Sequence, residues 1–135
     1  MPFPNMLFPE SDPFLDSATY ALFNSLCILT LPAEIAELEE QVALHLAQIE
    51  AHHRHNEFLD VDLAGRLTAE LLHLLERYSD YGAEQQQLIT GAVRYFVHTN
   101  DVESDMHSIL GMDDDVRVLN HVLTQIGHPQ RRIDP

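Results

Sequence analysis

The sequence predicts an all-α protein, a helical bundle of about five helices, on three observations. Apolar residues recur every three or four positions along five segments, which is the spacing of one face of an α-helix. No segment shows the strict alternation of apolar and polar residues that is typical of a half-buried strand. The 135 residues are 45% hydrophobic, so the chain is long enough and apolar enough for one domain with its own core.

The distribution of proline and of apolar residues divides the chain into three parts: a Pro- and Phe-rich lead-in over 1–11, a single helical domain over 12–128, and a tail over 129–135. The three prolines of the lead-in exclude a regular helix there. Its apolar side chains could still dock on the domain or on a second chain; they include Phe3, Leu7 and Phe8.

The first helix is expected to run from Asp12, an N-cap followed by proline, to about Leu29. Its apolar stripe comprises Ala18, Leu22, Leu26 and Leu29, widened by Phe23, Cys27 and Ile28. A helix on the surface of a bundle needs a single apolar stripe of about 100°, and this helix is apolar on more sides than that. We therefore expect it to be either the central helix or covered by a second copy. The second alternative predicts a homodimer with this helix or the lead-in in its interface.

Proline and aspartate mark the starts of the second and third helices. Pro32 begins the second helix, which fades through the histidine-rich run 51–55. Asp60 opens the third helix, which runs to Tyr78 and is followed by a turn over 79–82. The core positions expected on these two helices are Ile35, Leu38, Val42, Leu46, Ile49, Ala64, Leu67, Leu71 and Leu74.

The fourth and fifth helices flank an acidic segment, 99–112, in which we expect a short helical turn. The fourth helix is predicted over 83–98. The fifth is predicted over 113–126, and Gly127 and Pro129 end it. The core positions expected on these two helices are Leu88, Ile89, Ala92, Val93, Phe96, Val97, Val116, Leu119, Val122, Leu123 and Ile126.

Composition restricts the chemistry and the partners. Seven basic residues, all arginine, stand against 22 acidic ones, so the net charge is −15. This charge argues against nucleic acid or an anionic membrane as partner, because both require clustered cations. The absence of lysine excludes P-loop and Schiff-base chemistry, and a single cysteine excludes an intrachain disulfide. No apolar run is long enough for a membrane span, and we expect a cytoplasmic protein.

One short stretch of the chain combines six acidic residues with two histidines and no basic residue. The stretch 98–115 contains Asp101, Glu103, Asp105, Asp113, Asp114, Asp115, His98 and His107. Helix capping explains part of this pattern, with Asp113 as the N-cap of the last helix and the next two acids in its first turn. Alternatively, the carboxylates supply hard oxygen ligands for Mg²⁺ or Ca²⁺. The metal-ligating candidates are Asp101, Asp105, Asp114 and Asp115, with His98 or His107 assisting.

Other histidine patterns have simpler explanations than metal binding. Glu70 and His73 have the Glu-x-x-His spacing of di-iron bundles, but they share a face with arginines opposite the leucine stripe, so a solvated face is expected. His52 and His55 could chelate a transition metal at a helix end, where cationic imidazoles also suit the helix dipole. His45 borders a core stripe and is expected to be a partly buried histidine.

Six residues between positions 95 and 119 keep a characteristic spacing: Tyr95, Asp101, Asp105, Gly111, Asp114 and Asp115. In this register the stretch resembles the signature of the YkvA-like domain of unknown function. Thr99 and Ser104 stand where that family has prolines, so the turn geometry differs there. The resemblance implies a small helical domain and no established activity.

The function expected from the sequence is that of a non-enzymatic interaction or regulatory module, a homodimer with an unidentified protein partner. No Gly-x-Ser-x-Gly motif occurs, and Cys27 lies on an apolar helix, so nucleophilic catalysis has no candidate residue. The alternative is a divalent-cation-binding protein that uses the acidic segment 98–115. In a metal-dependent hydrolase built there, a metal-bound water would be the nucleophile.

Overall fold

The computed structural model describes residues 17–53, 60–99 and 112–133. These residues form five α-helices: α2 (Ser17–Leu26), α3 (Ile35–His53), α4 (Val61–Glu76), α5 (Ala83–Arg94) and α7 (Asp113–Gln125). No strand occurs among them, so the predicted all-α class is confirmed. The lead-in 1–11, the N-cap Asp12 and the helical turn expected within 99–112 lie almost wholly outside the described residues.

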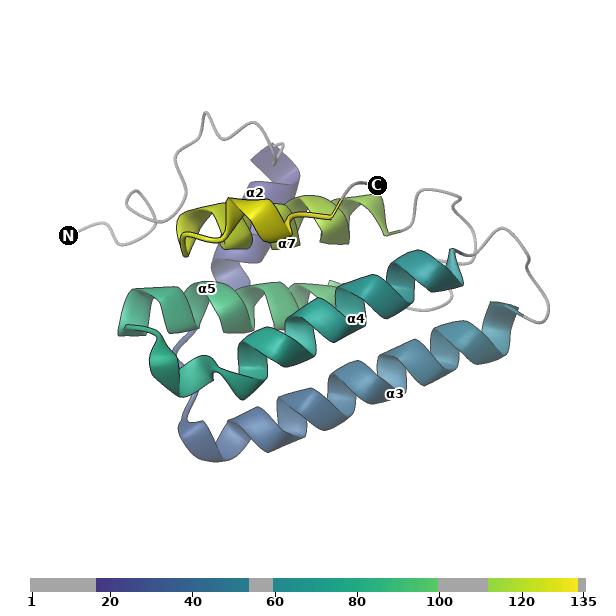
Figure 1. Ribbon diagram of the computed structural model, residues 1–135, viewed down its shortest axis with the longest axis horizontal. Helices are drawn as coiled ribbons and strands as arrows, with labels where there is room; N and C mark the ends of the chain where they lie inside the picture. Colours follow the sequence, from purple (N-terminus) through teal and green to yellow (C-terminus); the bar gives the residue numbers. More distant parts are fainter. Residues whose placement is uncertain (1–16, 54–59, 100–111, 134–135) are drawn as a thin grey trace.

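Four of the helices stack in the order α3, α4, α5 and α7, and α2 crosses behind α5 and α7 (Figure 1). Helix α3 packs mainly against α4, and α2 packs mainly against α5. The C-terminal turn lies along α7. Helices α3 and α4 present one face to their neighbours and one to solvent, as the helical spacing of their apolar residues requires. The second half of α5 differs, because residues 88–93 are all buried.

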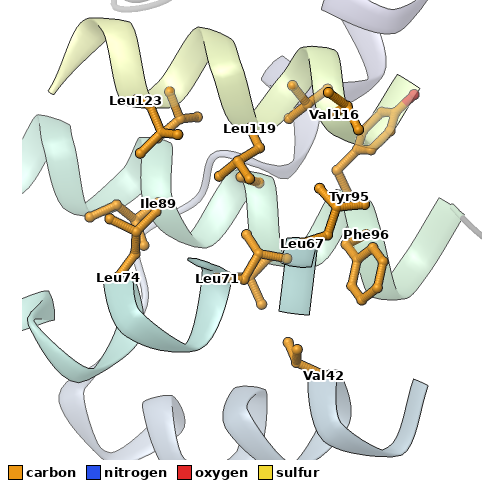
Figure 2. Close-up of a cluster of buried hydrophobic side chains, with 14 of the residues drawn as sticks. Val42, Leu67, Leu71, Leu74, Ile89, Tyr95, Phe96, Val116, Leu119 and Leu123 are labelled. Carbon is orange, nitrogen blue, oxygen red and sulfur yellow. The ribbon is translucent and has the colours of Figure 1, made fainter. Parts of the chain in front are cut away.

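The core lies between α4, α5 and α7. Leu67, Leu71 and Leu74 of α4 face Ile89 of α5 and the inward side of α7 (Figure 2). The core positions predicted for α4, α5 and α7 are buried, apart from Val97, which is partly buried against the core, so these predictions are confirmed with that exception. On α3, three predicted positions are buried and two are partly buried against the core; the latter are Ile35 and Leu46. Truncation of a fully buried core leucine, such as Leu67, to alanine typically lowers the free energy of unfolding by about 2–5 kcal/mol.

Local capping fixes the ends of the helices. The Asp60 carboxylate accepts a hydrogen bond from the Leu63 backbone N–H at 2.9 Å, which confirms the predicted start of α4. The Gln85 side chain accepts one from the Gly82 N–H at 3.1 Å at the start of α5. Gly127, at a φ of +90°, ends α7 in the left-handed conformation that the sequence predicted.

The first helix differs from its prediction. Helix α2 ends at Leu26, three residues before the expected end, and its buried side chains are Thr19 and Phe23. Of the predicted stripe, only Phe23 and, just beyond the helix, Cys27 are buried. The reason lies on α5, where Gly91 has no side chain. A Cβ at Gly91 would collide with the Sγ of Cys27 and lie 2.9 Å from a ring carbon of Phe23. This close approach selects the buried face of α2.

Because α2 buries only that face, it is not the central helix of the bundle. Leu22, Ile28 and Leu29 are exposed, whereas Phe23 is fully buried. Leu22 on the other side of α2, and Ile28 and Leu29 just beyond its end, remain on the surface of the described part of the chain.

The predicted fourth and fifth helices are confirmed, and the structure differs from the prediction in the residues that follow each of them. Helix α5 ends at Arg94 and continues as a π-helical turn, Tyr95–Thr99, in which Tyr95 and Phe96 are both buried. At the C-terminus, residues 129–133 pack as part of the domain, although 129–135 were predicted to be a tail. The side chain of Asn120 on α7 bonds both the N–H and the C=O of Ile133, at 2.8 and 2.9 Å.

Candidate functional site

The structure places the predicted cation ligands in different surroundings. Asp101 and Asp105 lie outside the described residues, as does the side chain of His98. Asp114 is exposed and Asp115 is buried, both in the first turn of α7. In the described part of the chain, no three His, Cys, Asp or Glu side chains form a group that could hold a metal ion.

The predicted cap of α7 is wrong by one residue. Met112, not Asp113, is the N-cap, and the Val116 N–H bonds the Met112 carbonyl at 3.1 Å. All three aspartates therefore fall within the first turn of the helix, where carboxylates interact favourably with the helix dipole.

His45 of α3 and Glu70 of α4 take structural roles, whereas the side chains of His52 and His55 lie outside the described residues. His45 is buried more deeply than predicted, with its ring edge-on to Phe96 and the ring centroids 4.7 Å apart. The carboxylate of Glu70 forms an ion pair with Arg131 at 2.6 Å. The face around Glu70, expected to be solvated, is thus partly covered by the C-terminal turn, whose position sequence periodicity does not indicate.

An exposed apolar segment, Leu22 to Leu31, is the most unusual surface feature of the described residues. Four of its side chains are large, apolar and exposed: Leu22 (39%), Ile28 (53%), Leu29 (64%) and Leu31 (60%). Elsewhere in the described chain, only Leu44 on α3 is comparable, at 59%. Scattered apolar residues are normal on a surface, but a concentration of them indicates a contact site.

Three side chains fasten the backbone of this segment. The Tyr78 hydroxyl donates to the Thr30 carbonyl at 2.9 Å, and the Arg94 Nη1 lies 3.4 Å from the Ile28 carbonyl. The Glu34 carboxylate accepts from the Leu31 N–H at 2.9 Å. These bonds anchor the non-helical backbone that follows α2.

A cleft of about 490 Å³ opens beside this segment, between α2, α3 and the end of α5. It is lined by Leu26, Glu34, Glu37, Leu38, Gln41, Arg94 and Val97. Sequence reasoning missed it, because its members are far apart in the chain and form no motif. The one sequence signal, the arginine in the last turn of the fourth helix, has an ordinary explanation in the helix dipole.

Burial makes the two titratable groups behind the segment poor acids. Desolvation raises the pKa of the Cys27 thiol far above its usual range, although the charge of Arg94 acts in the opposite direction. Burial likewise raises the pKa of Tyr78, with Arg94 lowering it and Glu34 raising it by smaller amounts. A thiol kept protonated is a weak nucleophile, so Cys27 acts here as a small apolar group.

No family model, no curated protein and no solved structure matches this chain. The resemblance to the YkvA-like domain therefore stays a prediction. Among the described helices, none combines the length and the apolar character needed to cross a membrane.

Proposed function

We propose that this protein is a non-enzymatic interaction module that forms a homodimer through its exposed apolar segment, Leu22 to Leu31. The observation that carries the proposal is the exposure of four large apolar side chains within ten residues. Their burial against a partner would remove apolar surface from water, which is the main driving force of association.

Charge favours a second copy of the chain as the occupant of this surface. Each copy has a net charge of −15, so two copies repel wherever their carboxylates meet. Residues 17–33 contain no Asp, Glu, Lys or Arg, and this is the longest uncharged run in the sequence. Two copies that meet through this run bring the fewest carboxylates together. A basic partner would instead be attracted to the acidic surfaces elsewhere.

The anchored backbone supports the same proposal. Tyr78 and Arg94 bond the carbonyls of Thr30 and Ile28, and Thr30 itself is buried. The leucines of the segment are therefore presented from a backbone that is already ordered. Association then requires less loss of conformational entropy than the ordering of a free loop would.

The test is sedimentation equilibrium of the full chain at micromolar concentration, with one variant in the segment and one matched control. Leu29→Glu places a charge at the most exposed position of the segment, and we expect it to give a folded 15.4 kDa monomer whose melting temperature, unlike that of the wild type, does not rise with protein concentration. Leu44→Glu changes the same residue type at nearly the same exposure on α3, and we expect it to remain dimeric.

Phe23 is not a suitable test position, because it is fully buried and its replacement by glutamate would unfold the chain. A wild-type chain that sediments as a monomer at every concentration would overturn the proposal. So would a Leu29→Glu variant that remains dimeric.

A further inference from the structure

We infer that the cleft between α2, α3 and α5 binds a small zwitterion with an apolar body, of the kind that an apolar dipeptide represents. This inference is independent of self-association. It rests on the size of the cleft, on the presence of both an arginine and glutamates in its lining, and on the hydrogen-bond donors of Arg94 that no described residue occupies.

The lining combines an apolar floor with charged groups from two different elements. Leu26, Leu38 and Val97 supply the apolar part, from α2, α3 and the π-helical turn. Arg94 is the last residue of α5, while Glu34, Glu37 and Gln41 come from the start of α3 and the turn before it. A volume of about 490 Å³ lies within the range of small-molecule pockets.

Arg94 has donors available for a ligand. Among the described residues, its hydrogen-bond acceptor is the Ile28 carbonyl, at a long 3.4 Å, and no carboxylate there forms an ion pair with it. A guanidinium carries five N–H donors in a fork that matches a carboxylate. Since Arg94 is partly buried, a carboxylate bound to it would be less screened than on an open surface.

The two glutamates make a simple anion an unsuitable ligand. One arginine against two glutamates gives the lining a net charge of −1, which repels phosphate or a dicarboxylate. A simple amine would be attracted to the glutamates but would leave the Arg94 guanidinium without an anionic partner. A ligand that carries both a carboxylate and an ammonium group can pair with both kinds of charge, its carboxylate with Arg94 and its ammonium with Glu37.

Glu37 is the better glutamate to test. The Glu34 carboxylate already bonds the Leu31 N–H at 2.9 Å, so its removal would disturb the backbone. The Glu37 carboxylate is exposed, and its contact with the Gln41 amide is long, at 3.4 Å. Replacement by glutamine at this position removes the charge and retains the shape.

The experiment is a calorimetric titration of the full chain with leucyl-leucine and two blocked forms of it. N-acetyl-leucyl-leucine lacks the ammonium group, and leucyl-leucinamide lacks the carboxylate. We expect the free dipeptide to bind at millimolar or lower concentration. Each blocked form should bind at least about tenfold more weakly than the free dipeptide, because it loses one charge-assisted hydrogen bond.

Two variants test which residue binds each end of the ligand. Arg94→Gln should remove the preference for the free dipeptide over its amide, and Glu37→Gln should remove the preference over the acetylated form. Glu40→Gln is the matched control, because it neutralises another exposed glutamate of α3 that does not line the cleft. It should bind all three peptides as the wild type does.

Two results would overturn the inference: no heat of binding for leucyl-leucine at millimolar concentration, or equal binding of all three peptides by the wild type. Because these arms use the wild-type chain alone, they are decisive even if a variant fails to fold. A Glu40→Gln variant that weakens binding as much as Glu37→Gln would also contradict it.

Discussion

At the scale of single residues, the contact between Gly91 and Cys27 decides how α2 is seated. The absence of a side chain at Gly91 lets the Cys27 sulfur and the Phe23 ring lie directly against α5. Ordinary core positions tolerate a change of one methyl group with some rearrangement, but both neighbours here are buried and closely packed.

We expect Gly91→Ala to lower the free energy of unfolding by about 1–3 kcal/mol or more, because the added methyl group overpacks this contact. Gly65→Ala is the control. Gly65 is also helical, and nothing lies within 4 Å of its added Cβ, so that variant should gain about 0.5–1 kcal/mol. Urea unfolding measures both. A loss of stability at Gly91 together with a gain at Gly65 would confirm the contact; stabilisation at both sites would contradict it.

Cys27 predicts an alkaline loss of stability. In the unfolded chain the thiol ionises above about pH 8.5, whereas burial keeps it protonated in the native state. The native state therefore binds the thiol proton more tightly than the unfolded state does. The free energy of unfolding decreases as pH rises above the pKa that the thiol has in the unfolded chain. The decrease reaches about 1.4 kcal/mol per pH unit.

The measurement is thermal unfolding under reducing conditions between about pH 8 and pH 10, below the range in which unfolded tyrosine ionises fully. Cys27→Ala should be less stable overall, because it leaves a cavity, but its stability should fall less steeply with pH. Parallel slopes for the two proteins would show that the thiol does not control this pH dependence.

At the scale of elements, Asn120 holds the C-terminal turn on α7. Its amide forms a buried pair of hydrogen bonds with the backbone of Ile133. We expect Asn120→Ala to cost about 1–3 kcal/mol, since two hydrogen bonds are lost, and to accelerate amide hydrogen exchange at Ile133. Thr124→Ala, which removes a partly buried hydrogen bond to the Asn120 carbonyl but no bond to Ile133, should leave the exchange at Ile133 nearly unchanged. Unchanged exchange at Ile133 would contradict this role.

The first turn of α7 tests capping against cation binding. Asp114 is exposed near the positive end of the helix dipole, so Asp114→Ala should cost about 0.3–1 kcal/mol in metal-free buffer. Glu76→Ala, at the negative end of α4, should cost nothing or stabilise slightly. Thermal melts and a titration with Mg²⁺ and Ca²⁺ decide the question. An unchanged melt together with a lost binding isotherm would favour a cation site over a structural role.

At the scale of the whole molecule, the net charge of −15 opposes both folding and association. We expect the melting temperature and the dimer fraction to rise between low salt and about 0.5 M NaCl, where the Debye length is about 4 Å. MgCl₂ at equal ionic strength is the control, because screening alone predicts the same effect from both salts. A flat salt profile would mean that the acidic residues are already paired.

Much of the fold follows from the local sequence. The stripes of α4, α5 and α7, the cap at Asp60 and the end at Gly127 are set by interactions within a few residues of each position. The helical periodicity of the apolar residues reflects these local interactions, and for this reason the fold class and most of the core were predictable. The acidic candidate site was predictable only as a local concentration of carboxylates, since their positions relative to one another depend on tertiary packing. Of its four candidate aspartates, the structure describes the side chains of Asp114 and Asp115, in the first turn of α7.

The sequence by itself determined the all-α class, the acidic character and the positions of five helices, because short-range patterns govern all three. Only the tertiary structure decided which face of α2 is buried and which groups line the cleft. Phe23 and Gly91 are distant in sequence, as are Glu37 and Arg94, and no periodicity relates them. Packing between helices depends on the matching of surfaces that the chain brings together only on folding. The exposed leucines and the charged cleft are consequences of that matching.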